Sequence, residues 1–208
     1  MPDRAAPDWP AQLELGIAER PLPGEERSGD RAVLAGFEGG ALVAAIDGLG
    51  HGEAAADAAA VAAEVLAEHR AEDPETLIEA CHEALRTTRG VVMTLAFVDL
   101  EGGRLSWTGV GNVEGRLVHA AAGPLAPSEG ALTKGGVVGY NLPSVRVTSA
   151  ALEAGDLLVL ATDGVGSGFS EALAGGGTAQ QIADRVLRDH GRAADDALVV
   201  VVRYRPGV

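Results

Sequence analysis

The sequence predicts one α+β domain whose sheets are mostly antiparallel. Apolar, strand-like segments follow one another across short glycine-containing turns, such as those at residues 38–40 and 101–103. Turns of this length join antiparallel strands, whereas parallel strands need long crossover connections. The helical segments are gathered in two places along the chain, which argues against a doubly wound parallel sheet. The length of 208 residues suits a single domain with a core that is stable without disulfides.

The first half of the chain predicts three strands followed by two helices. The first segment alternates apolar and polar side chains, and the next two flank a tight turn as in a hairpin. The helical segments repeat apolar side chains at helical spacing, and Asp73-Pro74 separates them. The strands are expected at residues 13–19, 32–37 and 41–46, and the helices at residues 53–69 and 75–86.

The second half predicts mostly strands, with one helix before the last of them. The strands are expected at residues 91–98, 105–110, 113–120, 145–150, 157–160 and 197–204, and the helix at residues 178–188. Residues 121–141 are rich in glycine and proline, so we expect an irregular loop there. Residues 1–10 are expected to be a loose N-terminal tail, and residues 11–208 a single domain.

The composition argues against several classes of function. The net charge is −14, from 30 acidic and 16 basic residues, with only 3% aromatic residues. Nucleic acids and anionic membranes attract clustered Lys and Arg, so we expect neither as a partner. The sequence has no apolar run of about 18 residues and no signal-peptide pattern. Cys81 is the lone cysteine, which indicates a buried structural thiol and a cytoplasmic location.

Aspartates stand at the ends of four predicted strands. Asp30 precedes a strand, Asp47 and Asp163 each end a strand and are followed by glycine, and Asp195-Asp196 introduces the last strand. A buried strand aims such a carboxylate with little freedom. A single Asp-Gly pair is at least as typical of an ordinary turn, but four similarly placed acids favour a common site. Converging carboxylates repel one another unless a cation neutralises them, and oxygen ligands favour Mg²⁺ or Mn²⁺.

The motifs around these aspartates carry a resemblance to a known family. The chain resembles the type 2C, metal-dependent protein phosphatases, and more closely their bacterial SpoIIE/RsbX branch. The resemblance spans about residues 13–204, and its motifs occur in the family's order. The matching motifs are SGD at residues 28–30, AIDGLGHG at 45–52, TRGVVMTLAFVD at 88–99, GVGNVEGRL at 109–117, ATDGV at 161–165 and DDALVVVVR at 195–203.

The resemblance implies a fold, a cofactor and a set of ligands. The fold is a four-layer αββα sandwich, with two mostly antiparallel sheets flanked by helices. The cofactor is a pair of divalent cations, Mn²⁺ or Mg²⁺, at one end of the sheets. Asp47 would bridge both cations, Gly48 would offer its carbonyl, Asp30 would serve one cation, and Asp163 and Asp195 would complete the other. Asp47, Asp163 and Asp195 are accordingly the candidate catalytic residues.

Three departures from the family pattern stand out. The closing motif carries Leu198 where the family usually has threonine. Leu49 occupies the place of a histidine found in eukaryotic relatives, and His51 lies two positions further on, where a structural role and a catalytic role are both open. The choice between Asp195 and Asp196 as the last ligand is open as well. No residue can be matched to the family's phosphate-binding arginine.

The resemblance also implies an activity and a partner. It implies hydrolysis of phosphoserine or phosphothreonine by attack of a metal-bound hydroxide. The expected substrate is a phosphorylated regulatory protein of the STAS-domain type, which belongs to the stressosome and a stress response. The alternative is a catalytically inactive relative that binds such a phosphorylated partner.

Other enzyme classes fit the sequence less well. Residues 50–55 match a dinucleotide-binding glycine fingerprint, but the helix that follows leads to a second helix instead of a parallel strand. A haloacid dehalogenase-type phosphatase would need a second aspartate where Leu49 stands. A serine hydrolase elbow around Ser167 would need glycine at the position of Val165. The remaining histidines show no ligand spacing, and we expect them at the surface: His69, His82, His119 and His190.

Overall fold

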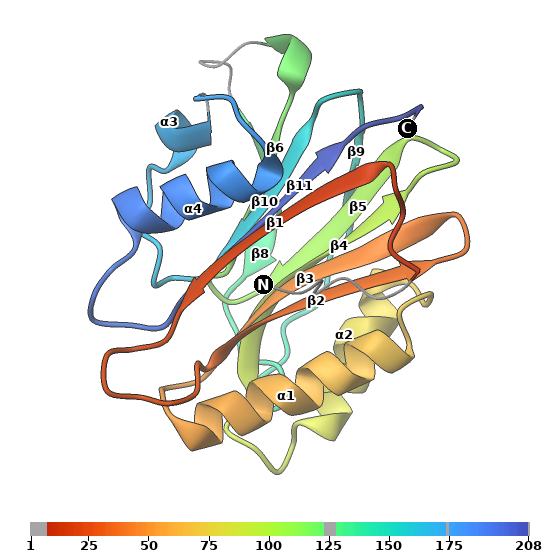
Figure 1. Cartoon of the computed structure of the whole chain (residues 1–208). Helices are drawn as coiled ribbons and strands as arrows, with labels where there is room; N and C mark the ends of the chain where they lie inside the picture. The colour runs from red at the N-terminus through yellow and green to blue at the C-terminus, as the bar shows by residue number, and fades with distance from the viewer. Residues whose placement is uncertain (1–7, 123–127, 174, 208) are drawn as a thin grey trace.

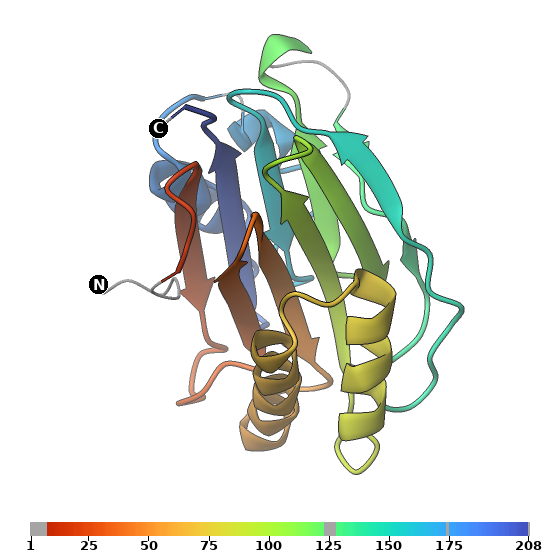
Figure 2. The same ribbon diagram turned by 90° about the vertical axis from the view of Figure 1, so that its right-hand side faces the viewer.

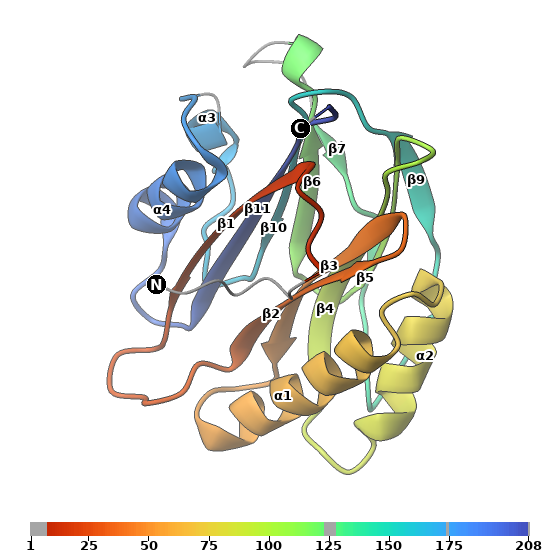
Figure 3. The ribbon, with the colours of Figure 1, turned by 45° about the vertical axis from the view of Figure 1, so that its right-hand side comes forward.

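The computed structural model describes residues 8–122, 128–173 and 175–207. Two sheets pack face to face, and helices cover both outer faces, as Figures 1 and 3 show. The predicted α+β class and its four-layer arrangement are therefore confirmed. In the described residues, no helix is long and apolar enough to span a membrane.

The first sheet has five strands in the order β1-β11-β10-β6-β7. Among the described residues its strand pairings are all antiparallel, and β11 lies between β1 and β10. Buried valines fill β11 because both of its faces are covered, one by the other sheet and one by helices. The bounds are β1 Leu13–Arg20, β6 Glu114–Val118, β7 Glu129–Gly130, β10 Leu157–Ala161 and β11 Ala197–Tyr204.

The second sheet has six strands, ordered β2-β3-β4-β5-β8, with β9 also paired to β5. The short β5–β8 pairing is parallel and the others are antiparallel. The two predicted hairpins, β2–β3 and β4–β5, are confirmed. The bounds are β2 Asp30–Phe37, β3 Gly40–Gly48, β4 Val91–Asp99, β5 Arg104–Val110, β8 Thr133–Lys134 and β9 Thr148–Ala151.

The helices cover the outer faces of the two sheets. Helices α1 (Glu53–Glu68) and α2 (Pro74–Ala84) lie on the second sheet, and α3 (Ser170–Leu173) and α4 (Ala179–His190) lie on the first. Fully buried alanines on α1 let that helix approach the sheet closely. Side-chain caps start α2 at Asp73 and α4 at Thr178. A separate core of apolar side chains fills the space between the sheets.

Two predicted irregular regions contain more structure than expected. The 121–141 region includes the short strands β7 and β8, although residues 123–127 lie outside the described residues. The predicted tail falls mostly on residues 1–7, which also lie outside them. Asp8 and Trp9 are described, and the Trp9 indole N–H donates to the Leu13 carbonyl at 2.8 Å. Trp9 also packs against the core between the sheets.

The four histidines expected at the surface are all partly exposed, but two of them also have partners that the sequence did not reveal. His82 accepts a hydrogen bond from the Gly139 N–H at 2.9 Å. His119 lies between two carboxylates, with Nδ1 2.8 Å from Asp156 and Nε2 3.1 Å from Glu129. Asp156 is fully buried, so the contact fastens the end of β6 to the start of β10. Sequence spacing could not reveal these partners because they are distant along the chain.

Replacing His119 with glutamine should destabilise the protein more at pH 6 than at pH 9. Hydrogen bonds to Glu129 and then Asp156 raise the pKa of His119 above its ordinary value. The stabilisation is therefore fully present below about pH 6.5 and is lost as pH rises through the folded-state pKa. Urea unfolding at both pH values should show a loss of roughly 1 kcal/mol at pH 6 only.

The matched control for this prediction is His69→Gln. His69 pairs with Glu72 at 3.0 Å, but its side chain is 42% exposed, and exposed ion pairs contribute little. That variant should unfold like the wild type at both pH values. An equal loss at pH 6 and pH 9 in His119→Gln would contradict the role of the charged imidazole.

Candidate functional site

The predicted site aspartates meet at one end of the two sheets. Asp30 begins β2 and pairs in register with Asp47, the next-to-last residue of β3. Asp163 follows the end of β10, and Asp195 precedes the start of β11 in the facing sheet. Because β10 and β11 are antiparallel neighbours, the end of one strand lies beside the start of the other. The fold thus brings all four carboxylates to one edge of the sandwich.

The glycines of the two Asp-Gly pairs permit this close approach. A Cβ atom on Gly48 would overlap the carbonyl oxygen of Ala55 in the first turn of α1. A Cβ atom on Gly164 would overlap the carbonyl oxygen of Asp196. Each glycine therefore lets a neighbouring backbone pass where any side chain would block it. The second contact holds the Asp163 turn directly against the start of β11.

Asp30 is fixed from the facing sheet by Thr162. The Thr162 hydroxyl donates to the Asp30 carboxylate at 2.6 Å and accepts the Leu198 backbone N–H at 2.9 Å. Asp30 is buried, with 6% of its surface exposed. This contact joins the two sheets at the site. The Leu198 side chain, in the place of the family's threonine, is fully buried in the core between the sheets.

The carboxylates perturb one another strongly. Burial, then the charges of Asp163, Asp195 and Asp196, raises the pKa of Asp47 from 3.8 to about 7. Burial is likewise the main cause that raises the pKa of Asp30 to about 8, with Asp47 and Asp196 adding to it. Burial and then Asp163 raise the pKa of Asp195. Mutual repulsion of this kind is what a bound cation relieves.

Asp195 and Asp196 have different surroundings. Asp196 is buried, and its two oxygens accept the backbone N–H groups of Leu22 at 2.7 Å and Gly29 at 2.9 Å. Its carboxylate therefore holds the loop between β1 and β2, directly before Asp30. Asp195 is only partly buried, and one of its oxygens accepts the Asp196 N–H at 2.9 Å. Asp196 therefore positions the loop before Asp30, and Asp195 is the more open of the two carboxylates.

Residues that were not assigned a role from sequence orient the site. The Asn112 side-chain amide donates to the Asp163 carboxylate at 2.8 Å, and the Arg192 guanidinium donates to the Asp163 carbonyl at 3.0 Å. Asn112 lies within the GVGNVEGRL motif and Thr162 directly precedes Asp163. Their positions in the sequence could therefore have marked them as site residues. His51 is exposed and lies 2.9 Å from Glu25. That contact supports a loop-holding role for His51.

The donor set suits hard divalent cations. It consists of carboxylates and a backbone carbonyl, with no cysteine and no histidine required. Within the described ranges, no group of three or more His, Cys, Asp or Glu side chains is already arranged as a metal site. Repelling carboxylates have no reason to point at one spot without a cation.

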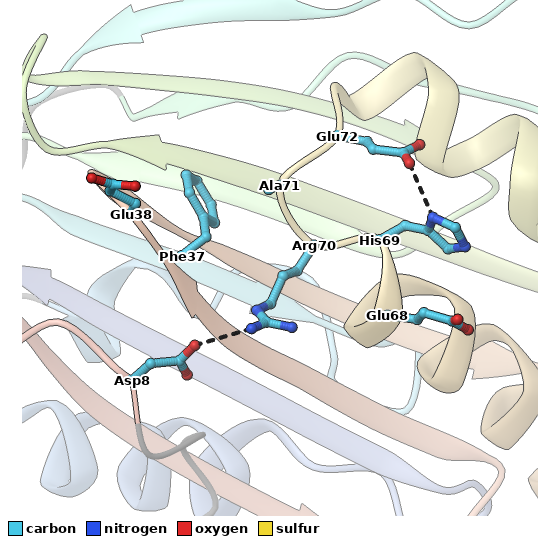
Figure 4. Close-up of a pocket in the computed structure, with 8 residues that line it drawn as sticks. All are labelled: Asp8, Phe37, Glu38, Glu68, His69, Arg70, Ala71 and Glu72. Carbon is cyan, nitrogen blue, oxygen red and sulfur yellow. Dashed lines mark hydrogen bonds and ion pairs between the residues drawn. The ribbon is translucent and has the colours of Figure 1, made fainter.

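A separate cavity of about 540 Å³ lies at the opposite end of β2 from Asp30. Figure 4 shows its lining, in which Arg70 pairs with Asp8 at 3.3 Å and His69 pairs with Glu72 at 3.0 Å. Arg70 also donates to the Gly36 carbonyl at 2.8 Å. These groups satisfy one another and tie α1 to the edge of β2. The cavity is therefore distinct from the carboxylate site.

Comparison with known proteins matches this geometry to a family. The sequence model of the family described as "Stage II sporulation protein E (SpoIIE)" matches residues 38–205. The chain belongs to the SpoIIE family. It is 25% identical over 142 residues to the phosphoserine phosphatase RsbX of Bacillus subtilis (strain 168). The aligned region spans 68% of this chain and 69% of that protein.

Several solved structures have the same fold. One is described as "The bacterial stressosome: a modular system that has been adapted to control secondary messenger signaling". It is 30% identical, covers 92% of this chain and 99% of that one, and has a TM-score of 0.84. The crystal structure of RsbX in complex with magnesium is 21% identical in sequence and has a TM-score of 0.83. The match covers 94% of this chain and 96% of that one. The chain is thus a metal-dependent protein phosphatase of the SpoIIE/RsbX type.

Proposed function

We propose that this phosphatase removes phosphate from phosphoserine or phosphothreonine on a regulatory partner protein in the cytoplasm. We further propose that the partner is a STAS-domain protein of a stressosome. The observation that carries the proposal is the meeting of Asp30, Asp47, Asp163 and Asp195 at one edge of the sandwich. RsbX is named a phosphoserine phosphatase, and another similar structure is described under the bacterial stressosome. Both names support this choice of substrate class.

We propose that the site holds two divalent cations, Mg²⁺ or Mn²⁺. Asp47 would bridge them, Asp30 and the Gly48 carbonyl would complete one position, and Asp163 and Asp195 the other. Magnesium bound to RsbX supports this choice of ion. When bound, such a pair supplies an activated water and neutralises charge on the phosphoryl oxygens.

The chain's own residues prepare the site for this chemistry. Thr162 holds Asp30 against the facing sheet, and Asn112 orients Asp163. Asp196 fastens the loop that precedes Asp30. Asp30, Thr162 and Asp196 are buried, so their contacts restrict the movement of Asp30, whereas the contact between Asn112 and Asp163 is exposed. The positioning groups lower the reorganisation needed to reach the transition state.

The proposal is tested with a STAS-domain protein phosphorylated on serine as the probe. Wild-type enzyme with Mn²⁺ should release inorganic phosphate from this protein, and Asp163→Asn should release none. The matched control Asp184→Asn changes an exposed aspartate on α4 and should be as active as the wild type. Binding of the phosphoprotein without any phosphate release would favour the alternative, a catalytically inactive binding protein.

A further inference from the structure

The segment of residues 131–147 concentrates exposed apolar side chains. Among the described residues, three large hydrophobic side chains are exposed: Leu132 at 42%, Tyr140 at 85% and Val147 at 40%. All three lie in this one segment. Exposed apolar groups that gather in one place mark interaction sites more often than scattered ones. Tyrosine is also among the residues that dominate binding energy at protein interfaces.

The same segment is basic in an otherwise acidic protein. The chain carries 30 acidic and 16 basic residues. Residues 131–147 contain Lys134 and Arg146 and no Asp or Glu. The nearby Arg89 adds a positive charge, whereas Arg86 is paired with Glu83 at 3.0 Å. A local excess of positive charge favours association with a negatively charged surface.

Contacts with β5 and α2 fix this segment in place. Thr133 pairs with Gly109 and Thr148 pairs with Trp107. The residues that precede them, Leu132 and Val147, are therefore both level with Thr108 of β5. The Lys134 ammonium donates to the Ser144 hydroxyl at 2.6 Å and so connects the end of β8 to the stretch that precedes β9. Figure 2 shows the chain between β8 and β9 following the edge of the second sheet down to the end of α2.

The tip of the segment lies beside the carboxylate site. Val138 forms an antiparallel bridge with Val91, and Val91 pairs on its other side with Gly48. Gly139 donates to His82 on α2, which fixes the turn that carries Tyr140. Arg89 extends over the glycine loop, because a Cβ atom on Gly50 would lie 2.9 Å from its guanidinium. The exposed side chains therefore begin next to the site and lead away from it.

We propose that Leu132, Lys134, Tyr140, Arg146 and Val147 form a docking face for an acidic surface of the phosphorylated substrate protein. This inference rests on the proposed function and names the chemistry of its partner. The apolar side chains supply contact area, and the basic ones select negative charge. The docking face would hold the substrate while its phosphoserine occupies the site beyond Val91. Specificity would then come from the partner's surface and not from the phosphate alone.

A pair of matched phosphoserine peptides tests the docking face. Both have roughly 15 residues, about 50 Å when extended, and they differ only in Glu or Lys around the phosphoserine. With Mn²⁺ present, the wild type should have a kcat/KM about tenfold higher for the acidic peptide, mostly through KM. Arg146→Glu should remove the preference, and Tyr140→Ser should raise KM for the acidic peptide several-fold.

The control variant is Arg104→Glu, which reverses an exposed charge at the far end of β5. It should keep the preference, and all three variants should hydrolyse p-nitrophenyl phosphate like the wild type. Equal kcat/KM for the two peptides in the wild type, or a preference that survives in Arg146→Glu, would overturn the docking face while leaving the phosphatase intact. Failure of the wild type to hydrolyse p-nitrophenyl phosphate and both peptides would overturn the proposed function and, with it, the docking face.

Discussion

Asp47→Asn should lower Mn²⁺-dependent hydrolysis of p-nitrophenyl phosphate on the order of 1,000-fold or more. Asp47 is the one carboxylate that is assigned to both cations, and the asparagine amide has the same shape but no charge. Steady-state kinetics over a range of Mn²⁺ concentrations would measure the loss. Because a bridging ligand is missing, extra Mn²⁺ should not restore the rate. Activity near the wild-type level would end the assignment of Asp47.

The same substitution should stabilise the metal-free protein at pH 8. The pKa of Asp47 is about 7 in the folded protein and 3.8 ordinarily, so the folded state binds more protons between those values. Its stability therefore falls as pH rises from about 4 to about 7, and the full cost is present above pH 7. Removal of this carboxylate should raise the free energy of unfolding by about 2–4 kcal/mol at pH 8 and have little effect at pH 4.

Guanidinium unfolding in the presence of EDTA measures this gain. The control variant Asp184→Asn removes an exposed carboxylate on α4 and should leave stability unchanged at both pH values. A variant that is inactive and also less stable than the wild type at pH 8 would point to general misfolding. A variant that is inactive and more stable would show that the carboxylate of Asp47 destabilises the metal-free protein and is needed for activity.

Asp195→Ala and Asp196→Ala should both lower activity, but only Asp196→Ala should lower stability. Asp196→Ala leaves the buried N–H group of Gly29 and the partly buried N–H group of Leu22 without an acceptor, which should cost about 2–4 kcal/mol of stability. Loss of these bonds also frees the loop before Asp30, so activity should fall as well. Asp195→Ala removes a repelling charge from the metal-free protein. It should keep full stability and lose Mn²⁺ affinity and activity.

Urea unfolding of the metal-free variants, followed by calorimetric Mn²⁺ titration, separates the two roles. Asp196→Asn is the conservative control, because its amide oxygen can still accept one of the two N–H groups and should recover part of the stability. If Asp195→Ala were strongly destabilised while it still bound Mn²⁺ normally, the two roles would be reversed.

The individual strands, turns and helices were predicted well because each depends on a pattern within one short segment. The alternation in residues 13–19, the turns at residues 38–40 and 101–103, and the helical spacing in α1 and α2 are each readable within one segment. The αββα layering depended on the resemblance. Sheet stacking arises from contacts between strands such as β2 and β11, which lie far apart in sequence, so periodicity alone does not reveal it.

The candidate site was predictable in its charged residues and not in the groups that support them. Asp-Gly at a strand end marks Asp47 and Asp163 locally. The distinction between Asp195 and Asp196 depends on which of them meets the backbone of the loop between β1 and β2. The Thr162 contact with Asp30 crosses between the two sheets. Partners of this kind become visible only when the sheets are placed together.

The central claim is that the converging aspartates hold divalent cations. The most direct measurement is the anomalous difference density of Mn²⁺ in crystals of the wild-type protein. We predict two peaks, with one between Asp47, Asp30 and the Gly48 carbonyl, and the other between Asp47, Asp163 and Asp195. Manganese-dependent activity in crystals or solution, together with density located away from Asp47 or absent from this edge of the sandwich, would contradict the claim.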